Sequence, residues 1–477
     1  MPDFPLSTET TNFFEKRGSR LVRFNSTFFT YEPSGYYREL DEELLRAEIR
    51  SAIEWQLKLN EVNSTIDEIK GATVIDSHGV ELPLFLDGIQ AIMPPARTLI
   101  VCRNGMLDPV AGNLYQHTDS LFTLNALPFD YAPSAHAPTK WLNFVQEVFD
   151  GDAKSIAELQ KLFGYLLTLD TRLQKIFAII GPTRSGKGTI GRVLEALLGK
   201  GNVCGPSFTK LGGDFGLQSF IGKQVAIIAD ARIGSRTDRM VVAERLLSIS
   251  GEDSLDVARK HRTDWHGRLS TRILILSNEL PALPDPSGSL SARFVAFYTP
   301  RSFLGHEDRE LTSKLLGELP GILNWSLEGL RRVQSGDEIV TPTAARELIE
   351  GIEALGSPVT AFVKEQCSID PTASTQKDTL WIEYRKWHYT NGIPGNPLSK
   401  EVFGRALKTA FSGTIKEHRP RATDDGPRPR HWSGIALAGP PSQPDIALTP
   451  RSPSYGNQSG PAAPPFGPCV VRVPVHE

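Results

Sequence analysis

The sequence has few cysteines and no long apolar run, and both absences narrow the classes of protein to which it can belong. Its four cysteines are far apart, and no Cys-x2-Cys pair is present: Cys102, Cys204, Cys367 and Cys469. A zinc ribbon or a disulfide framework is therefore not expected, and a reducing cytoplasm fits. No apolar stretch reaches the roughly 20 residues of a membrane span. The N-terminus lacks a basic and then apolar signal region, so we expect no membrane association.

Neither sign of charge dominates. Lys and Arg number 52 against 55 Asp and Glu, which leaves a net charge of −3. The whole chain therefore has no nucleic-acid signature, and any such contact must come from local basic clusters. With 477 residues, 40% of them hydrophobic, the chain is long enough for two or three packed domains. The last residues, 438–477, are rich in Pro, Gly and Ser, which predicts a disordered tail.

The most informative segment is a glycine-rich loop between an apolar strand and a helix. The apolar run 176–180 predicts a buried strand, and 190–198 has helical periodicity. Backbone N–H groups of such a loop, together with the N-terminus of the helix, are typical of phosphate binding, and Lys187 adds charge for the β- and γ-phosphates. We therefore predict that the whole loop binds ATP: Gly181, Pro182, Thr183, Arg184, Ser185, Gly186, Lys187, Gly188 and Thr189.

The loop departs from the usual pattern at one position. Gly188 stands where a Ser or Thr would place a hydroxyl on Mg²⁺, and Thr189 follows one residue later. We expect Thr189 to hold the metal through a water or a shifted loop. The run Gly-Lys-Gly-Thr also occurs in nucleoside monophosphate kinases, which keeps a kinase open as an alternative.

Two later apolar strands end in polar side chains. Val225–Ala229 leads to Asp230, and a carboxylate at the end of a strand beside the loop is suited to Mg²⁺. The run from Arg272 leads to Asn278, whose amide would orient a water against the γ-phosphate. No second acid follows Asp230, so the base that activates water stays open among five residues: Asp230, Glu244, Glu252, Asp253 and Glu279.

Basic residues suggest two further roles. Arg293 comes directly before a third apolar run, and Arg301, a second candidate, comes after it. Such an arginine would stabilise the charge that develops on the phosphate transferred in a neighbouring subunit. Arg259, Lys260 and His261, followed by an aromatic residue, suit a nucleic-acid backbone. A salt-bridged surface arginine and a solvated charged face are the ordinary alternatives.

In this order and spacing, these motifs resemble superfamily 3 helicases, specifically the helicase half of the primase-helicases of phages, plasmids and poxviruses. The resemblance rests on the loop, the strand to Asp230, the run Leu-Leu-Ser-Ile-Ser-Gly-Glu-Asp-Ser-Leu with the following Arg-Lys-His, Ser-Asn-Glu-Leu-Pro and Ser-Ala-Arg-Phe. It covers roughly residues 90–335.

The resemblance implies an α/β, AAA+-like P-loop ATPase core that assembles on DNA as a ring, expected to be a homo-hexamer. Unwinding would run 3′ to 5′ and use ATP with Mg²⁺, in the cytoplasm of a bacterial host cell. Lys187 would bind phosphate, Asp230 the metal, and Asn278 the water or γ-phosphate. Arg293 would act in trans, and the segment around Lys260 would be the hairpin that grips single-stranded or duplex DNA.

We expect five regions: 1–90, α+β and unassigned; 91–172, the helicase-associated helical region; 173–335, the ATPase domain; 359–437, a winged-helix-like domain; and 438–477, the tail. The first would contain a helix over Arg38–Leu57, with one apolar face made of Leu44, Leu45, Ile49, Ile53 and Leu57. Residues 96–126 would be strand-rich with a hairpin at Asn104-Gly105, and residues 137–172 would form two helices. In the fourth, helices over 380–387 and 399–411 precede a basic hairpin whose arginines would touch phosphates: Arg419, Arg421, Arg428 and Arg430.

Two alternatives to a helicase remain at this point. An ATP-binding assembly factor without turnover fits the lone acid at Asp230, and a nucleotide kinase fits only Gly-Lys-Gly-Thr. The region before residue 90 is short for a primase domain, so a separate primase would supply primers.

Overall fold

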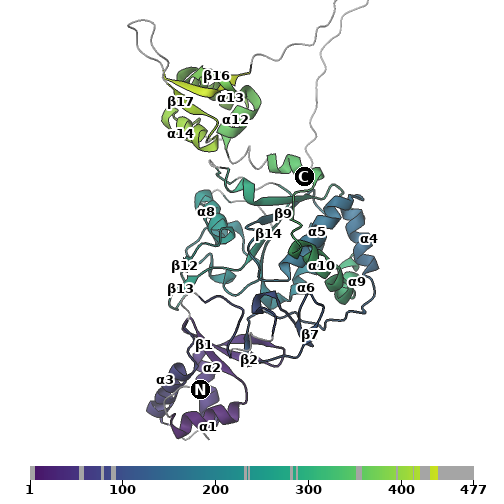
Figure 1. Cartoon of the computed structure of the whole chain (residues 1–477), viewed down its shortest axis with the longest axis vertical. Helices are drawn as coiled ribbons and strands as arrows, with labels where there is room; N and C mark the ends of the chain where they lie inside the picture. The colour runs from purple at the N-terminus through teal and green to yellow at the C-terminus, as the bar shows by residue number, and fades with distance from the viewer. Residues whose placement is uncertain are drawn as a thin grey trace, which may run out of the picture. The chain divides into compact units, whose positions relative to one another are not determined.

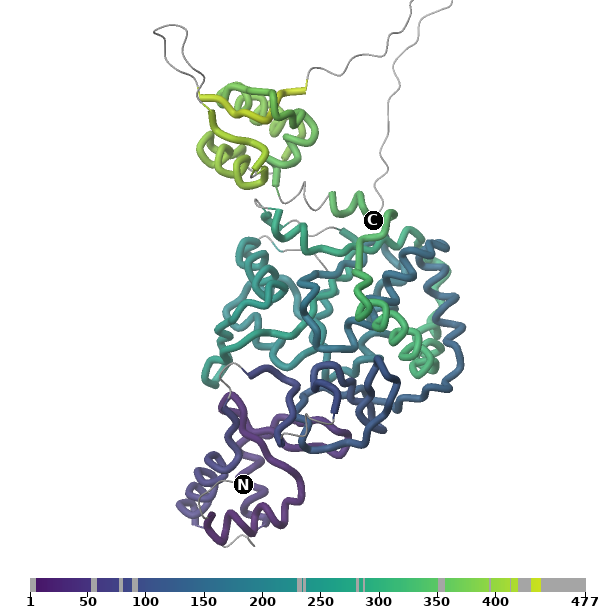
Figure 2. Tube along the Cα trace, viewed as in Figure 1, coloured from purple at the N-terminus to yellow at the C-terminus, as the bar shows by residue number. Residues whose placement is uncertain are grey.

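The computed structural model describes residues 6–438, apart from 53–57, 77–79, 88–92, 230–233, 235–236, 280–282, 286–287, 351–356, 394–395, 412 and 419–429. The chain divides into two compact units, Met1–Leu437 and Ala438–Glu477. Figures 1 and 2 show the course of the chain. The predicted tail therefore lies outside the described residues except for Ala438.

The N-terminal part combines a small antiparallel sheet with three helices: α1 (Thr8–Arg17), β1 (Leu21–Phe24), β2 (Thr27–Glu32), β3 (Tyr36–Leu40), α2 (Glu42–Ala52) and α3 (Leu59–Thr73). Asn25 and Ser26 have positive φ angles and form the tight turn between β1 and β2. This turn type favours Asn because Asn tolerates the left-handed region. Leu45, Ile49 and Ile66 are fully buried in the core between the helices.

The predicted helix over Arg38–Leu57 was wrong in its start and in one face residue. Arg38 lies in β3 because this segment pairs with β2, and α2 begins only at Glu42. Asp41 begins the helix: its carboxylate accepts a hydrogen bond from the Glu43 N–H at 2.8 Å. Leu44, expected on the buried face, is 54% exposed. The predicted positions 53 and 57 lie outside the described residues.

The next segment is strand-rich, as predicted: β4 (Leu84–Phe85), β5 (Ile100–Cys102), β6 (Gly105–Leu107), β7 (Leu114–Tyr115) and β8 (Leu121–Phe122). The predicted hairpin is confirmed, since Cys102 pairs with Gly105 across the turn. Short 3-10 helices also occur among the described residues: η2 (Ala96–Thr98), η3 (Lys200–Asn202), η4 (Gln218–Phe220), η5 (Ser291–Arg293) and η6 (Thr343–Ala345).

A parallel sheet of five strands forms the centre of the larger part: β9 (Ile176–Ile180), β10 (Val203–Cys204), β11 (Val225–Ile228), β14 (Arg272–Ser277) and β15 (Phe294–Tyr298). Their order is β10-β11-β14-β9-β15, and every neighbouring pair is parallel. All residues of β9 and β14 are buried, which agrees with their apolar runs. The three strands predicted from these runs are confirmed, and the chain is a mixed α/β protein.

Helices cover both faces of this sheet: α4 (Thr139–Val148), α5 (Ala153–Leu166), α6 (Lys187–Leu198), α9 (Leu311–Leu316) and α10 (Leu319–Gln334) on one face, and α7 (Phe208–Leu211) and α8 (Arg239–Ser250) on the other. Successive side chains of β9 point to opposite faces of the sheet. Phe177 and Ile179 pack in the core with α5 and α10, and Ile176 and Ala178 pack in the core with α7 and α8. Figure 1 shows the strands between α8 and the α5–α10 pair. The two helices predicted between 137 and 172 are α4 and α5.

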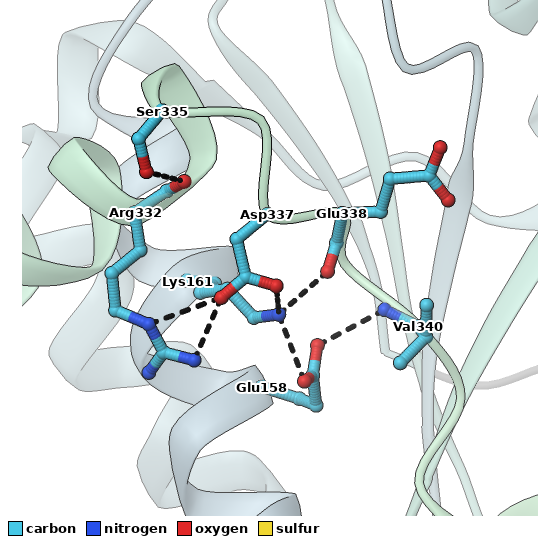
Figure 3. A network of polar contacts seen from close by, with 7 residues as sticks. All are labelled: Glu158, Lys161, Arg332, Ser335, Asp337, Glu338 and Val340. Atoms are coloured by element: carbon cyan, nitrogen blue, oxygen red, sulfur yellow. Dashed lines mark hydrogen bonds and ion pairs between the residues drawn. The ribbon is translucent and has the colours of Figure 1, made fainter.

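Helices α5 and α10 pack closely at Gly164 and Gly329, and they share a polar network. A Cβ on Gly329 would lie 2.1 Å from the Gln160 carbonyl oxygen, so the helix backbones touch there. The buried Lys161 ammonium contacts Glu158 Oε1 at 2.9 Å and Asp337 Oδ1 at 3.0 Å (Figure 3). The Val340 N–H donates to the second Glu158 oxygen at 3.0 Å, so this network fixes the chain that follows α10.

Residues 358–437 form a unit with its own core: α12 (Pro358–Gln366), β16 (Cys367–Gln376), α13 (Lys377–Thr390), α14 (Lys400–Ala410), β17 (Lys416–His418) and β18 (His431–Leu437). The antiparallel strands have the order β16-β18-β17. Tyr384 stacks on Phe403 with ring centroids 4.6 Å apart, which joins α13 to α14. Both predicted helices are confirmed, and Trp387 is buried in this core.

Candidate functional site

The glycine-rich loop lies at the edge of the parallel sheet where the strands end. It connects β9 to α6, and the Thr299 N–H beyond β15 donates to the Ile180 carbonyl at 2.9 Å. A Cβ on Gly181 would lie 2.2 Å from Thr299 Oγ1, so only glycine fits there. Gly186 has φ +88°, and its Cβ would lie 2.6 Å from Val148 Cγ2. Both glycines are therefore required by the backbone course.

The backbone of this loop presents unused donors. Within the described residues, the N–H groups from Thr183 through Gly188 donate no hydrogen bond. They lead into the first turn of α6, where the helix dipole adds partial positive charge. A run of free N–H groups at a helix N-terminus is an anion-binding arrangement, and phosphate is the common ligand.

Lys187 folds back onto the same loop. Its ammonium donates to the carbonyls of Gly181 at 2.8 Å and Pro182 at 2.7 Å, and to Ser185 Oγ at 3.0 Å. The residue is 7% exposed, and burial lowers the pKa of its amine. No acidic side chain in the described part of the chain pairs with it. The cation is thus held by neutral acceptors, which an anionic ligand can replace.

The hydroxyl of Thr189, predicted to hold Mg²⁺, already has a partner. Arg192 Nη2 donates to Thr189 Oγ1 at 2.9 Å, and Thr189 is largely buried. The positive charge of Arg192 beside this oxygen opposes a divalent metal at the same atom, so Thr189 is poorly suited as a direct ligand. Asp230, the other predicted ligand, lies outside the described residues. Among described residues, no group of three or more His, Cys, Asp or Glu side chains could hold a metal.

Asn278 lies beside the loop, as the strand pattern predicts. It follows β14, and its side-chain amide donates to Thr183 Oγ1 at 3.3 Å. Glu279 stands next to it at the same edge and is exposed. Of the other candidate bases, Glu252 accepts from Gln174 Nε2 at 3.2 Å, just before β9 at the opposite edge. Glu244 and Asp253 are exposed on and after α8. Position therefore favours Glu279 among the described candidates.

Arg293 lies at the far edge of the sheet from the loop. It immediately precedes β15, whose first residue is in register with Ile176 at the start of β9. At about 3.3 Å per residue, the loop is roughly 15 Å away along the strands. Its guanidinium donates to the Leu247 carbonyl at 2.6 Å and to Ser250 Oγ at 2.9 Å, at the end of α8. Arg293 therefore lies too far from the glycine-rich loop of its own chain to contact it.

Arg301, the second candidate, lies beyond the opposite end of β15 from Arg293. It is exposed, and its guanidinium carbon is 5.3 Å from the centre of the Phe303 ring. The Phe303 N–H donates to the Arg184 carbonyl at 2.9 Å, so this segment runs along the glycine-rich loop. Arg301 is thus the arginine of the two that lies near its own loop.

The predicted basic segment is the tip of an antiparallel hairpin formed by β12 (Leu255–Val257) and β13 (Trp265–Gly267). Arg259, Lys260 and His261 all lie in its loop, and the latter two are exposed. Arg259 Nε donates to the Thr263 carbonyl at 2.8 Å and closes the loop. The tip therefore presents positive charge on a well-defined turn.

Of the predicted C-terminal arginines, the structure describes only Arg430. Its carbonyl accepts from the Lys377 N–H at 2.9 Å, and its exposed guanidinium lies 3.6 Å from Glu417. The remaining three lie outside the described residues: Arg419, Arg421 and Arg428.

Sequence reasoning missed two residues at this site. Thr299 hydrogen-bonds to Ser185 Oγ at 2.7 Å, and Arg192 contacts Thr189. The signal for Arg192 was its helical spacing from Gly188 and Thr189. Thr299 had no such signal, because it is distant in sequence and reaches the loop only through strand pairing.

Comparisons with known families match two separate parts of the chain. Residues 13–150 match the family described as D5 N terminal like. Residues 179–293 match a family of unknown function, DUF5906, and this match contains the glycine-rich loop, Asn278, the basic hairpin and Arg293. The first match crosses residue 90, where the sequence suggested a division.

Solved structures resemble this chain over most of its length. The A form apo structure of the NrS-1 C terminal region is 12% identical with a TM-score of 0.50, and the match covers 90% of this chain and 99% of that one. An apo structure of the same region, residues 305–718, is 13% identical with a TM-score of 0.49 over 90% and 100% of the two chains. At this identity, the first likeness shows that the two chains share a fold.

Proposed function

We propose that this protein is an ATP-dependent DNA helicase of the phage and plasmid primase-helicase type, with an AAA+-like P-loop core. The observation that carries the proposal is the loop itself, in which free backbone N–H groups, two required glycines and Lys187 meet at the start of α6. This arrangement suits the phosphates of a nucleotide.

Two comparisons support the family. The match over residues 13–150 is to the N-terminal region of a primase-helicase family. The fold shared with the NrS-1 C terminal region extends over nearly the whole described chain. Together they favour a replication enzyme over a nucleotide kinase, since neither match points to a kinase.

In this proposal, the loop N–H groups and Lys187 bind the triphosphate, and Asn278 orients the attacking water. ATP supplies the phosphoanhydride whose hydrolysis provides the free energy. Asp230 would hold Mg²⁺, with Thr189 behind a water at most, because the Thr189 hydroxyl accepts from Arg192. Glu279, beside Asn278, is the described acid best located to take the proton of the water.

Arg293 would complete the site of a neighbouring subunit in a homo-hexameric ring. Its distance from its own loop supports action in trans. The hairpin bearing Arg259, Lys260 and His261 would grip DNA, and the exposure of Lys260 and His261 at its tip supports this role. A separate primase would supply primers, and the site of action would be the cytoplasm of the bacterial host.

Residues 358–437 would form a winged helix that binds the DNA backbone. The order helix, strand, two helices and a hairpin, with three antiparallel strands, supports this assignment. The segment between β17 and β18 would be the wing, with Arg430 at its base and the other three arginines within it.

The decisive test measures ATP hydrolysis by the full chain with and without single-stranded DNA, for wild type, Lys187→Ala and the control Lys200→Ala. Lys200 is exposed just beyond the end of α6. We expect DNA-stimulated turnover that only Lys187→Ala abolishes, followed by 3′ to 5′ strand displacement. Loss of DNA stimulation in Lys260→Ala, with basal turnover kept, would add support for the hairpin.

A second candidate, an ATP-binding assembly factor without turnover, is favoured by one observation. The Arg192–Thr189 contact places a cation where a catalytic metal would be held. Tight ATP binding by the wild type, ATP-dependent ring formation and no hydrolysis with any DNA would select this candidate and reject the helicase. Phosphate transfer to a nucleoside monophosphate would reject both.

A further inference from the structure

Arg192 has no assigned role, yet its guanidinium lies beside Gly188 and Thr189, the last two residues of the glycine-rich loop. It is three residues after Thr189 and four after Gly188 on α6, so all three share one helix face. Helical side chains lean toward the N-terminus of their helix, which carries the Arg192 guanidinium back to the first turn.

Two hydroxyls hold the guanidinium at this position. Nη2 donates to Thr189 Oγ1 at 2.9 Å, and Nε donates to Thr312 Oγ1 on α9 at 3.3 Å. The side chain is exposed, and no described carboxylate forms an ion pair with it. An exposed cation with neutral partners retains donors for an anionic ligand.

Gly188 makes room for this arrangement. A Cβ at Gly188 would lie 3.4 Å from Arg192 Nη1, which is already van der Waals contact. The longer side chain of a Ser or Thr would extend further into the space beside the guanidinium. The absence of a side chain at Gly188 therefore leaves the space beside this residue to the Arg192 guanidinium.

We propose that Arg192 binds phosphate oxygens of a nucleoside triphosphate beside Lys187, and supplies positive charge that other sites of this kind obtain mainly from Mg²⁺. This inference rests on the proposed function, because it assumes a nucleotide in the loop. A guanidinium stays protonated and offers paired donors that match phosphate geometry. Nucleotide binding by this chain therefore depends less on Mg²⁺ than it would with a metal-binding Ser or Thr at Gly188.

The test is equilibrium titration of a fluorescent ATP analogue into the full chain, in Mg²⁺ and in EDTA. Arg192→Ala is expected to raise Kd in EDTA about tenfold or more, the usual effect of losing charged hydrogen bonds to a ligand. The increase in Mg²⁺ is expected to be smaller, so the ratio of the two Kd values rises. Arg192→Lys should give an intermediate ratio, and the control Lys200→Ala the wild-type ratio.

A second variant, Gly188→Ser, tests the same proposal by filling the space beside the Arg192 guanidinium. Gly188→Ser would displace the guanidinium and add a hydroxyl for the metal, so it too is expected to raise the EDTA-to-Mg²⁺ ratio. Melting temperatures measured without nucleotide would show that each variant is folded.

The outcomes separate this inference from the proposed function. If Lys187→Ala weakens binding but Arg192→Ala leaves both Kd values at those of Lys200→Ala, Arg192 merely ties α6 to α9 and the inference is rejected. If the wild type and Lys187→Ala bind the analogue equally, or neither binds, the nucleotide site itself is rejected.

Discussion

The hydroxyl groups of Ser185 and Thr299 hydrogen-bond at 2.7 Å, although the two residues are far apart in the sequence. Ser185 lies in the middle of the glycine-rich loop, and Thr299 follows β15. Ser185 Oγ also accepts from the Lys187 ammonium at 3.0 Å. The end of a neighbouring strand thereby positions both the loop and its cation.

Thr299→Val should weaken nucleotide binding while keeping the fold. Valine has nearly the same shape but cannot bond to Ser185 or to the Ile180 carbonyl, which the Thr299 hydroxyl also contacts at 3.3 Å. If the loosened loop loses about 1 kcal/mol of its hold on the ligand, Kd rises roughly fivefold. Titration of a fluorescent ATP analogue measures the change. The matched control is Thr341→Val, which removes a hydroxyl that accepts from the Ala296 N–H of the same strand at 3.2 Å, away from the loop. Equal Kd changes in both variants would contradict the prediction.

Gly186→Ala should destabilise the protein much more than Gly201→Ala. Gly186 combines φ +88° with a Cβ position 2.6 Å from Val148 Cγ2, whereas a Cβ on Gly201 meets nothing within 4 Å. The strained φ costs about 1–2 kcal/mol and the clash adds about as much or more. Urea unfolding of the two variants checks this. If the two variants unfold at the same urea concentration, the loop accommodates the added Cβ, and the close contact with Val148 does not require glycine at position 186.

Asp337→Asn should remove part of the acid sensitivity of the fold. The Lys161 ammonium, and then the Arg332 guanidinium, hold the pKa of the Asp337 carboxyl below its usual value of 3.8. A lowered folded-state pKa contributes stability that is complete above 3.8 and is lost as the pH falls through the lower value. Melting temperatures measured from pH 6 down to about 3 should therefore fall less steeply in the variant.

The control for this experiment is Asp214→Asn. Asp214 is exposed and makes no side-chain hydrogen bond or ion pair in the described part of the chain. If the dependence of melting temperature on pH changes equally in both variants, the cause is a general charge effect and not the network of Figure 3.

Arg293→Ala should lose ATP hydrolysis but keep ATP binding, because the arginine lies across the sheet from its own loop. Mixing this variant with Lys187→Ala should restore part of the activity, since the Lys187→Ala subunit supplies an intact Arg293 to its neighbour. A mixture of Lys187→Ala and Asn278→Ala should stay inactive, because both defects are in a subunit's own site. Recovery in the second mixture, or none in the first, would argue against action in trans.

The glycine-rich loop and Asn278 were predictable because their signals are local. An apolar run that ends in a turn defines both the strand and the side chain that follows it. Since the carboxyl ends of parallel strands meet at one edge, Asn278 had to lie near Thr183. The start of α2 was not predictable in this way, because pairing of Arg38 with β2 overrode a helical periodicity that continues through it.

By itself, the sequence determined the apolar strands, the glycine positions, the helix that follows the glycine-rich loop and the basic segment at Lys260, because each depends on neighbours along the chain. Only the tertiary structure decided that Thr299 supports the loop, that Arg293 faces away from it and that Arg192 reaches Thr189. These relationships depend on strand order, on register and on the direction in which side chains leave a helix, and they become definite only when the elements pack together.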